Sequence, residues 1–369
     1  MIVENNKKNI FLVAGRTGGP FFPIPKIISV LDNFNPIIIG VKNSFEERIC
    51  VAEQLELVYL PEAKLNILSF KNSSVRDQIK GFLDLIWNLF KLSFSLWVSI
   101  VQILRYQPKL IYSTGSFLAV PLFLAAKVLN ILRLTSVRLV VHQQDPLVGL
   151  SNRICVKLAD LQSCIFDYTK HNFSEFQDSY LIQNPILESK FAPKLKWENS
   201  ALQSFVQGSK QPTILIFGGG SGAKFINEWV IENKEVLTHK FSVVHLTGIL
   251  QKDSQKTINT SNYFALEAVF NDMPQLLSSV DYVLCRAGLG AISELEYLHK
   301  KAFLVPLPDS HQELNAELVK DSFVILEQKN SELWMETILD KRVFENKSFG
   351  QSKGLQDEKY YEQLKGLLS

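Results

Sequence analysis

The chain has 369 residues, of which 46% are hydrophobic and 21% charged, and its formal net charge is only +2. This length and apolar content predict two domains, each with its own hydrophobic core. A charge this small gives no long-range field for nucleic acid, and no basic run interleaves with aromatic residues, so we expect no nucleic-acid partner.

Short β-branched runs alternate with longer helical stretches along the whole chain. The strand-like runs are 10–14, 37–41, 109–113 and 138–142, and then 213–217, 241–246, 281–285 and 302–305. Apolar runs without polar alternation are typical of strands buried on both faces of a parallel sheet. The sequence therefore predicts an α/β protein with helices packed on both faces of each sheet.

Residues 187–212 divide the two sets of strands. This stretch is charged, has no sustained period and contains two prolines. We therefore expect an N-terminal domain over 1–186, a C-terminal domain over 187–345 and a closing helix within 346–369.

Each half opens with a strand, a glycine-rich turn and a helix, and the turn glycines are Gly15, Gly18 and Gly19, then Gly218, Gly219, Gly220 and Gly222. Glycine lets the backbone approach a ligand, and a helix N-terminus offers free N–H groups, so two such turns favour phosphate binding over plain strand–helix packing. The second turn also fits a dinucleotide pattern. The following strand ends in Thr247 and Gly248 without an acidic residue for the ribose, which disfavours a nicotinamide or flavin enzyme.

The sequence shows no metal-ligand spacing among its cysteines and histidines and no Asp-x-Asp pair, so we expect neither a metal nor a cofactor. The four cysteines are typical of reduced thiols in a cytosolic chain. The polar N-terminus and the short apolar run behind it predict no export signal.

Seven segments, in chain order, resemble the MurG family of UDP-N-acetylglucosamine (UDP-GlcNAc) transferases. Family segments GGTGGH, GGY-x-S-x-P and HEQN-x-x-x-G-x-x-N correspond to 15–20, 115–121 and 142–152, and segments GNPVR, GGSQGA, RSGALTVSE and HQxxNA correspond to 183–187, 218–223, 286–294 and 311–316. The resemblance covers nearly the whole chain. It implies the GT-B fold, in which two Rossmann-like α/β domains face each other across a cleft.

The chain also departs from the family pattern. The family histidine after the first glycine turn is Pro20, and the glutamate and asparagine of HEQN are Gln143 and Asp145. The arginine of GNPVR is Leu187, and the serine of GGSQGA is Gly220. These departures bear on activity and exact substrate more than on the fold.

The resemblance implies a donor site in the C-terminal domain. Glu294 would accept hydrogen bonds from the ribose diol, and backbone N–H groups of Leu289 to Ser293 would meet the diphosphate without a metal. The implied substrate-binding residues are Thr17, Gly18, Gly19, Asp145, Gly220, Ser221, Phe270, Leu289, Gly290, Ala291, Ile292, Ser293, Glu294 and Gln312. Gln312 would contact the hexose, and the Phe270 backbone would read uracil. The residues alone leave open a dipole-complementing Glu294, an ordinary loop Gln312 and a core Phe270.

A base near the acceptor hydroxyl helps an inverting transfer, and Pro20 cannot serve as one. The nearest candidates by motif are His142, at a strand end, and Asp145, in the loop after it. Asp145 is a candidate base or hexose ligand. The alternative is a solvated loop aspartate before Pro146.

Residues 82–104 predict a helix with a narrow polar stripe that contains Asp84, Asn88, Lys91, Ser95, Ser99 and Gln102. Its apolar arc is wider than core packing requires. Core burial, association with a membrane surface and a true span remain as alternatives, although two charges in one stripe disfavour a span. Lys64, Lys71, Arg76 and Lys80 precede the segment and suit anionic head groups.

The resemblance implies transfer of GlcNAc from UDP-GlcNAc to a polyprenyl-linked muramyl-peptide, in peptidoglycan precursor synthesis, by a peripheral protein at the cytoplasmic face of the cell membrane. Two alternatives remain open. One is a transferase that makes another glycolipid, and the other is a catalytically weak sugar-nucleotide-binding or partner subunit.

Overall fold

A computed structural model describes residues 7–15, 18–42, 44–61, 75–192, 197–219, 222–249, 259–269, 271–348 and 355–368. The chain divides into two units. One consists of Met1–Ile186 together with Gly354–Ser369, and the other of Leu187–Lys353. The last helix of the chain thus belongs to the N-terminal unit.

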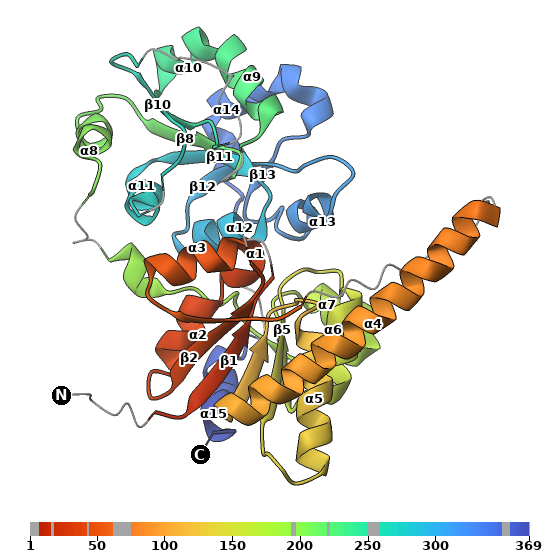
Figure 1. The fold of residues 1–369 in the computed structure, drawn as a ribbon. Helices are drawn as coiled ribbons and strands as arrows, with labels where there is room; N and C mark the ends of the chain where they lie inside the picture. Colours follow the sequence, from red (N-terminus) through yellow and green to blue (C-terminus); the bar gives the residue numbers. More distant parts are fainter. Residues whose placement is uncertain are drawn as a thin grey trace. The chain divides into compact units, whose positions relative to one another are not determined.

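The N-terminal domain is built on a seven-stranded parallel sheet with the order β3-β2-β1-β4-β5-β6-β7. Figure 1 labels three of these strands, β1, β2 and β5. Its strands are β1 (Asn9–Val13), β2 (Asn35–Gly40), β3 (Glu56–Tyr59), β4 (Leu110–Ser113), β5 (Arg138–Gln143), β6 (Leu161–Cys164) and β7 (Tyr180–Leu181). Its helices are α1 (Gly18–Phe21), α2 (Ile24–Val30), α3 (Phe45–Ala52), α4 (Val75–Tyr106), α5 (Ala119–Ile131), α6 (Leu150–Cys155), α7 (Asp167–Asn172) and α15 (Asp357–Gly366).

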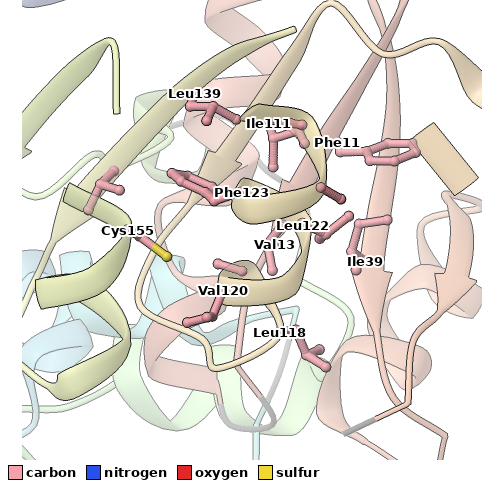
Figure 2. Packing of buried hydrophobic residues seen from close by; sticks show 14 of the residues in the cluster. Phe11, Val13, Ile39, Ile111, Leu118, Val120, Leu122, Phe123, Leu139 and Cys155 are labelled. Carbon is pink, nitrogen blue, oxygen red and sulfur yellow. The ribbon is translucent and has the colours of Figure 1, made fainter. Parts of the chain in front are cut away.

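Both faces of this sheet are covered, and alternate residues of an inner strand point into two different cores. In β1, Phe11 and Val13 belong to one core and Ile10 and Leu12 to the other, and all four are fully buried. Figure 2 shows the first core, in which Phe123 of α5 lies among the strand side chains. Such continuous burial explains the unbroken apolar runs in the sequence.

Helix α15 completes the second core. Its Tyr360 and Leu364 are fully buried, and the Tyr360 hydroxyl lies 3.4 Å from the hydroxyl of Tyr112 on β4. The Gln356 N–H before the helix donates to the carbonyl of Leu181 at 2.8 Å. The C-terminal segment therefore packs as an integral part of the N-terminal domain.

The C-terminal domain contains a six-stranded parallel sheet with the order β10-β9-β8-β11-β12-β13. Its strands are β8 (Thr213–Phe217), β9 (Ser242–Leu246), β10 (Tyr263–Leu266), β11 (Tyr282–Arg286), β12 (Lys301–Val305) and β13 (Val324–Ile325). Its helices are α8 (Ser200–Gln207), α9 (Lys224–Glu232), α10 (Lys234–Lys240), α11 (Met273–Ser279), α12 (Leu289–Tyr297), α13 (His311–Leu318) and α14 (Trp334–Leu339), and a 3₁₀ turn, η3, spans Glu188–Phe191.

All eight strand-like runs expected from the sequence are strands, and both sheets are parallel as predicted. One difference lies in the dividing stretch 187–212, where helix α8 forms although the sequence there has no sustained period. Asn199 caps it by accepting from the Leu202 N–H at 3.0 Å, and Leu202 and Val206 are buried on one face. The Asp272 carboxylate also accepts from the backbone N–H groups of Glu198 and Asn199, at 2.7 and 2.8 Å, which fixes the start of the helix.

Each sheet reverses its strand order at its centre, between β1 and β4 in the first domain and between β8 and β11 in the second. In open parallel sheets, ligands bind beyond the carboxyl ends of the strands at such a point. Both glycine-rich turns follow a strand of these pairs, so the topology places them where ligands are expected.

Candidate active site

The glycine turn after β8 is a tight one. Gly219 and Gly222 have φ values of +93° and +85°, and the Gly222 N–H donates to the Gly219 carbonyl at 2.9 Å. A Cβ on Gly218 would collide with Ala223. At Gly219 and Gly222 this positive φ suits glycine alone without strain, and Gly218 has no room for a side chain, so no side chain covers the backbone at these three positions before α9.

The first turn of α12 begins directly after β11. Gly288 precedes it in an extended conformation and offers no side-chain cap, and its carbonyl accepts from the Ile292 N–H at 3.0 Å. The N–H groups of Leu289, Gly290 and Ala291 therefore have no acceptor within the helix. An anionic oxygen at this helix end would meet both these donors and the positive end of the dipole.

Glu294 lies on the second turn of the same helix and is half-buried. Burial raises the pKa of its carboxyl to about 7, and the ammonium of Lys190 in η3 opposes that rise. The turn η3 packs beside α12, since the rings of Phe191 and Tyr297 have centroids 5.3 Å apart. A carboxylate held in this way gains strongly from a ligand that donates hydrogen bonds to it.

The first turn of α13 presents Gln312. Its side-chain oxygen accepts from the Leu307 N–H at 3.1 Å, which directs the amide NH₂ away from that contact. Ser310 caps α13 by accepting from the Gln312 N–H at 3.2 Å. The side chain of Gln312 is thus oriented by the loop before α13, with a donor group left to face a ligand.

Two residues that the sequence analysis did not single out hold these loops in place. Arg286 donates to the carbonyls of Val305 and Pro306, at 3.3 and 3.2 Å, and burial lowers the pKa of its guanidinium. Buried Asn315 donates to the Ala287 carbonyl at 3.2 Å and ties α13 to the loop before α12. The available signal was their position inside the segments that resemble the MurG family.

In the N-terminal domain, Gly15 follows β1 and packs close to Pro20. A Cβ on Gly15 would lie 3.0 Å from Cγ of Pro20. The carbonyl of Pro20 accepts from the Thr114 hydroxyl at 2.6 Å, which joins the first glycine turn, through α1, to the end of β4. Gly18 and Gly19 begin α1.

His142, which the sequence suggested as a candidate base, is fully buried in β5. Its Nδ1 lies 3.0 Å from the Ser163 hydroxyl and its Nε2 lies 3.4 Å from Oδ1 of Asn184. Burial lowers the pKa of the imidazole to about 4. Its position therefore suits a neutral structural histidine better than a group that exchanges protons with a bound substrate.

Asp145 lies two residues after β5 and is exposed. Its carbonyl accepts from the side-chain amide of Gln143 at 2.6 Å, and the same amide nitrogen lies 3.1 Å from the carbonyl of Leu147. The side-chain oxygen of Gln143 accepts from Asn152 at 2.5 Å. The loop that carries Asp145 is thus held by two buried amide side chains.

Four residues of the implied site, Thr17, Gly220, Ser221 and Phe270, lie outside the described residues. Among the residues that the structure describes, no group of three or more His, Cys, Asp or Glu side chains is placed to hold a metal ion.

Helix α4 carries an exposed apolar stripe, which consists of Trp87, Phe90, Phe94, Trp97, Val101 and Leu104. These positions repeat every three or four residues and so form one face. Ser95 and Ser99, from the predicted polar stripe, are instead fully buried, and the Ser99 hydroxyl donates to the Ser95 carbonyl at 2.8 Å. No helix in the described part of the chain is long and apolar enough to cross a membrane. The side chains of Asp84, Arg76 and Lys80, and all of Lys64 and Lys71, lie outside the described set.

Comparison with protein families matches both domains. The glycosyltransferase family 28 N-terminal domain matches residues 10–161, and the glycosyltransferase family 28 C-terminal domain matches residues 213–362.

Curated relatives match nearly the whole chain. A UDP-N-acetylglucosamine–N-acetylmuramyl-(pentapeptide) pyrophosphoryl-undecaprenol N-acetylglucosamine transferase of Francisella tularensis is 28% identical over 351 residues, covering 92% of this chain and 88% of the relative. The protein of the same name from Listeria monocytogenes is 28% identical over 342 residues, covering 88% of each. A crystal structure of MurG from Acinetobacter baumannii is similar with a TM-score of 0.67 and 19% identity, over 98% of this chain and 99% of that one. The expected GT-B fold class is confirmed.

Proposed function

The chain belongs to glycosyltransferase family 28, and we propose that it transfers GlcNAc from UDP-GlcNAc to an undecaprenyl-diphosphate muramyl-pentapeptide in peptidoglycan precursor synthesis. The observation that supports this most directly is the α12 region. A half-buried Glu294 carboxylate and the uncapped N–H groups of Leu289 to Ala291 occur on one helix. Together these groups suit a ribose diol and a diphosphate.

The donor half of the reaction follows from this arrangement. The α12 N-terminus would stabilise the negative charge that develops on the diphosphate as it leaves. Backbone N–H groups and the helix dipole would supply this stabilisation. Glu294 would fix the ribose, and the amide NH₂ of Gln312 would donate to a hexose hydroxyl. We propose the remaining implied contacts, Gly220, Ser221 and Phe270, on the resemblance alone.

The acceptor half would use the N-terminal domain. As the acceptor hydroxyl oxygen bonds to C1 of GlcNAc, the C1–oxygen bond to UDP breaks and its electron pair leaves with UDP. The hydroxyl proton needs an acceptor, and Asp145 is the exposed carboxylate in the segment that resembles HEQN. Asp145 is therefore our proposed base, whereas His142 is proposed to support the sheet end from within.

We further propose that the protein is peripheral, at the cytoplasmic face of the membrane, and that the α4 apolar stripe is the contact. From Trp87 to Leu104 the stripe is about 26 Å long at 1.5 Å per residue. Two tryptophans, 57% and 60% exposed, lie on it, and this residue type prefers the membrane interface. A polyprenyl-linked acceptor resides in the membrane, so the enzyme needs such a surface.

Calorimetry tests the donor half directly. We expect UDP-GlcNAc to bind in the presence of EDTA and more tightly than UDP-glucose, and NADH not to bind. Affinity that disappears in EDTA, or tight binding of NADH, would contradict the proposal. Donor binding without any transfer would instead favour a sugar-nucleotide-binding subunit.

A further inference from the structure

Gln143 is 3% exposed at the end of β5 and makes three side-chain hydrogen bonds. Its amide nitrogen donates to the carbonyls of Asp145 and Leu147, and its amide oxygen accepts from Nδ2 of Asn152. Thr169 also donates to the carbonyl of Pro146 at 3.1 Å. Three consecutive carbonyls, at residues 145, 146 and 147, are thus held by side chains.

The orientation of the Gln143 amide is dictated by its partners. A backbone carbonyl only accepts, so the NH₂ must face Asp145 and Leu147, and Asn152 must then present its own NH₂ to the Gln143 oxygen. An ionised glutamate has no donor, so at this position it would put an anionic oxygen against two carbonyls. The geometry requires an amide at 143.

This hydrogen-bonding requirement concerns one of two neighbouring departures from the family pattern. The family segment HEQN has a carboxylate at the second position and an amide at the fourth, whereas this chain has Gln143 and Asp145. Gln143 has an amide where the family has a carboxylate, and Asp145 has a carboxylate where the family has an amide. The Gln143 amide donates to the backbone carbonyl of Asp145. The two departures are therefore structurally linked.

We propose that Gln143 is a positioning residue that fixes Asp145 for proton abstraction from the acceptor hydroxyl. The inference rests on the proposed function, because it assumes that Asp145 is the base. Gln143 acts only through the backbone of the 145–147 loop and does not touch substrate. Such preorganisation matters because a catalytic group displaced by about 1 Å can lose about 100-fold in rate.

A double-mutant cycle on kcat tests this. Gln143→Glu is isosteric and removes both donated bonds, and we expect it to lower kcat by about 10- to 100-fold. In an Asp145→Asn background the same change should lower kcat by less than about twofold, because the clamp then has no base to position. KM for UDP-GlcNAc and Kd for UDP should stay within about twofold in every variant, since these report the other domain.

Asn152→Asp breaks the clamp from its other end. An aspartate at 152 only accepts, so it draws the Gln143 NH₂ away from the two carbonyls, and kcat should fall in the same direction. Gln177→Glu is the matched control, because it makes the same charge change at an exposed position of the same domain and should leave kcat unchanged.

Two results would overturn the inference. One is a kcat for Gln143→Glu equal to wild type, and the other is an equal loss in both backgrounds, which would mark Gln143 as merely structural. If Gln143→Glu does not fold, Asn152→Asp replaces it. The loss of kcat caused by Asn152→Asp is then compared between the wild-type and Asp145→Asn backgrounds, with the same two outcomes. A wild-type protein that binds UDP-GlcNAc but transfers nothing would instead refute the proposed function itself, so the two failures are distinguishable.

Discussion

The ammonium of Lys190 opposes the effect of burial on the Glu294 carboxyl, whose pKa still rises from the ordinary value of 4.5 to about 7. Glu296, two residues along the same helix, also has a pKa raised to about 7, by burial alone. The raised pKa is therefore not specific to the proposed ribose contact. The two carboxyls make a natural pair for experiments, because only Glu294 is assigned to the ligand.

The first prediction concerns stability without ligand. Between pH 4.5 and 7 the folded chain binds more protons at Glu294 than the unfolded chain does, so the free energy of unfolding falls as the pH rises through this window. At pH 8, Glu294→Gln should therefore raise the free energy of unfolding, by roughly 1–3 kcal/mol after allowance for solvent screening. Urea unfolding measures it.

Glu296→Gln should stabilise similarly, yet only Glu294→Gln should weaken UDP-GlcNAc binding, by about 1–3 kcal/mol for the lost charged hydrogen bonds. Equal donor affinity in the two variants would exclude Glu294 as the ribose ligand.

A second prediction is a pH dependence of donor binding. The ribose diol needs the ionised Glu294, and a pKa near 7 leaves about a tenth of it ionised at pH 6 and most of it at pH 8. UDP-GlcNAc should therefore bind about tenfold more tightly at pH 8 than at pH 6. Glu296→Gln should keep this dependence and Glu294→Gln should lose it. A flat wild-type profile over this range would argue against the assignment.

A third prediction tests the α4 apolar stripe. Replacing Phe90 and Trp97 together by aspartate should lower binding to vesicles that contain phosphatidylglycerol by at least about tenfold, since burying one such side chain is worth about 1.5–3 kcal/mol. Val236→Asp is the control, because Val236 is 48% exposed on α10 of the other domain. Vesicle co-sedimentation that does not change in the double variant would refute the stripe as the membrane contact.

Most strands of the two sheets were predictable from the sequence, and the reasons are local. Runs such as 10–14 and 213–217 identified strands because strands buried on both faces have no polar alternation. The two-residue strands β7 and β13 gave no such signal, since so short a run has no period. Helix α8 has only eight residues, too few for a sustained period, and the Asp272 carboxylate that also fixes its start lies far along the chain.

Side-chain roles were harder to predict than elements. The sequence placed His142 and Asp145 close together as alternatives, and only the fold distinguishes a buried imidazole bonded to Ser163 from an exposed carboxylate. Likewise, a helical stripe says which residues share a face but not which face is covered. Ser95 and Ser99 are small enough to pack closely against the domain, which leaves the aromatic side chains exposed.

A fourth prediction concerns Asp145 itself. If it is the base, Asp145→Asn should lower kcat by about 10²- to 10⁴-fold, although it restores the residue typical of the family. Kd for UDP should not change. A higher turnover in this variant would instead mark the carboxylate as a hexose contact and place the base elsewhere.

The most direct test of the central claim is transfer of radiolabelled GlcNAc from UDP-GlcNAc to a polyprenyl-diphosphate muramyl-pentapeptide by the full chain, measured with EDTA present. The account predicts that label enters the lipid fraction and that one UDP is released for each sugar transferred. If the donor is bound at saturation and no label reaches any lipid acceptor, the chain does not perform the proposed reaction.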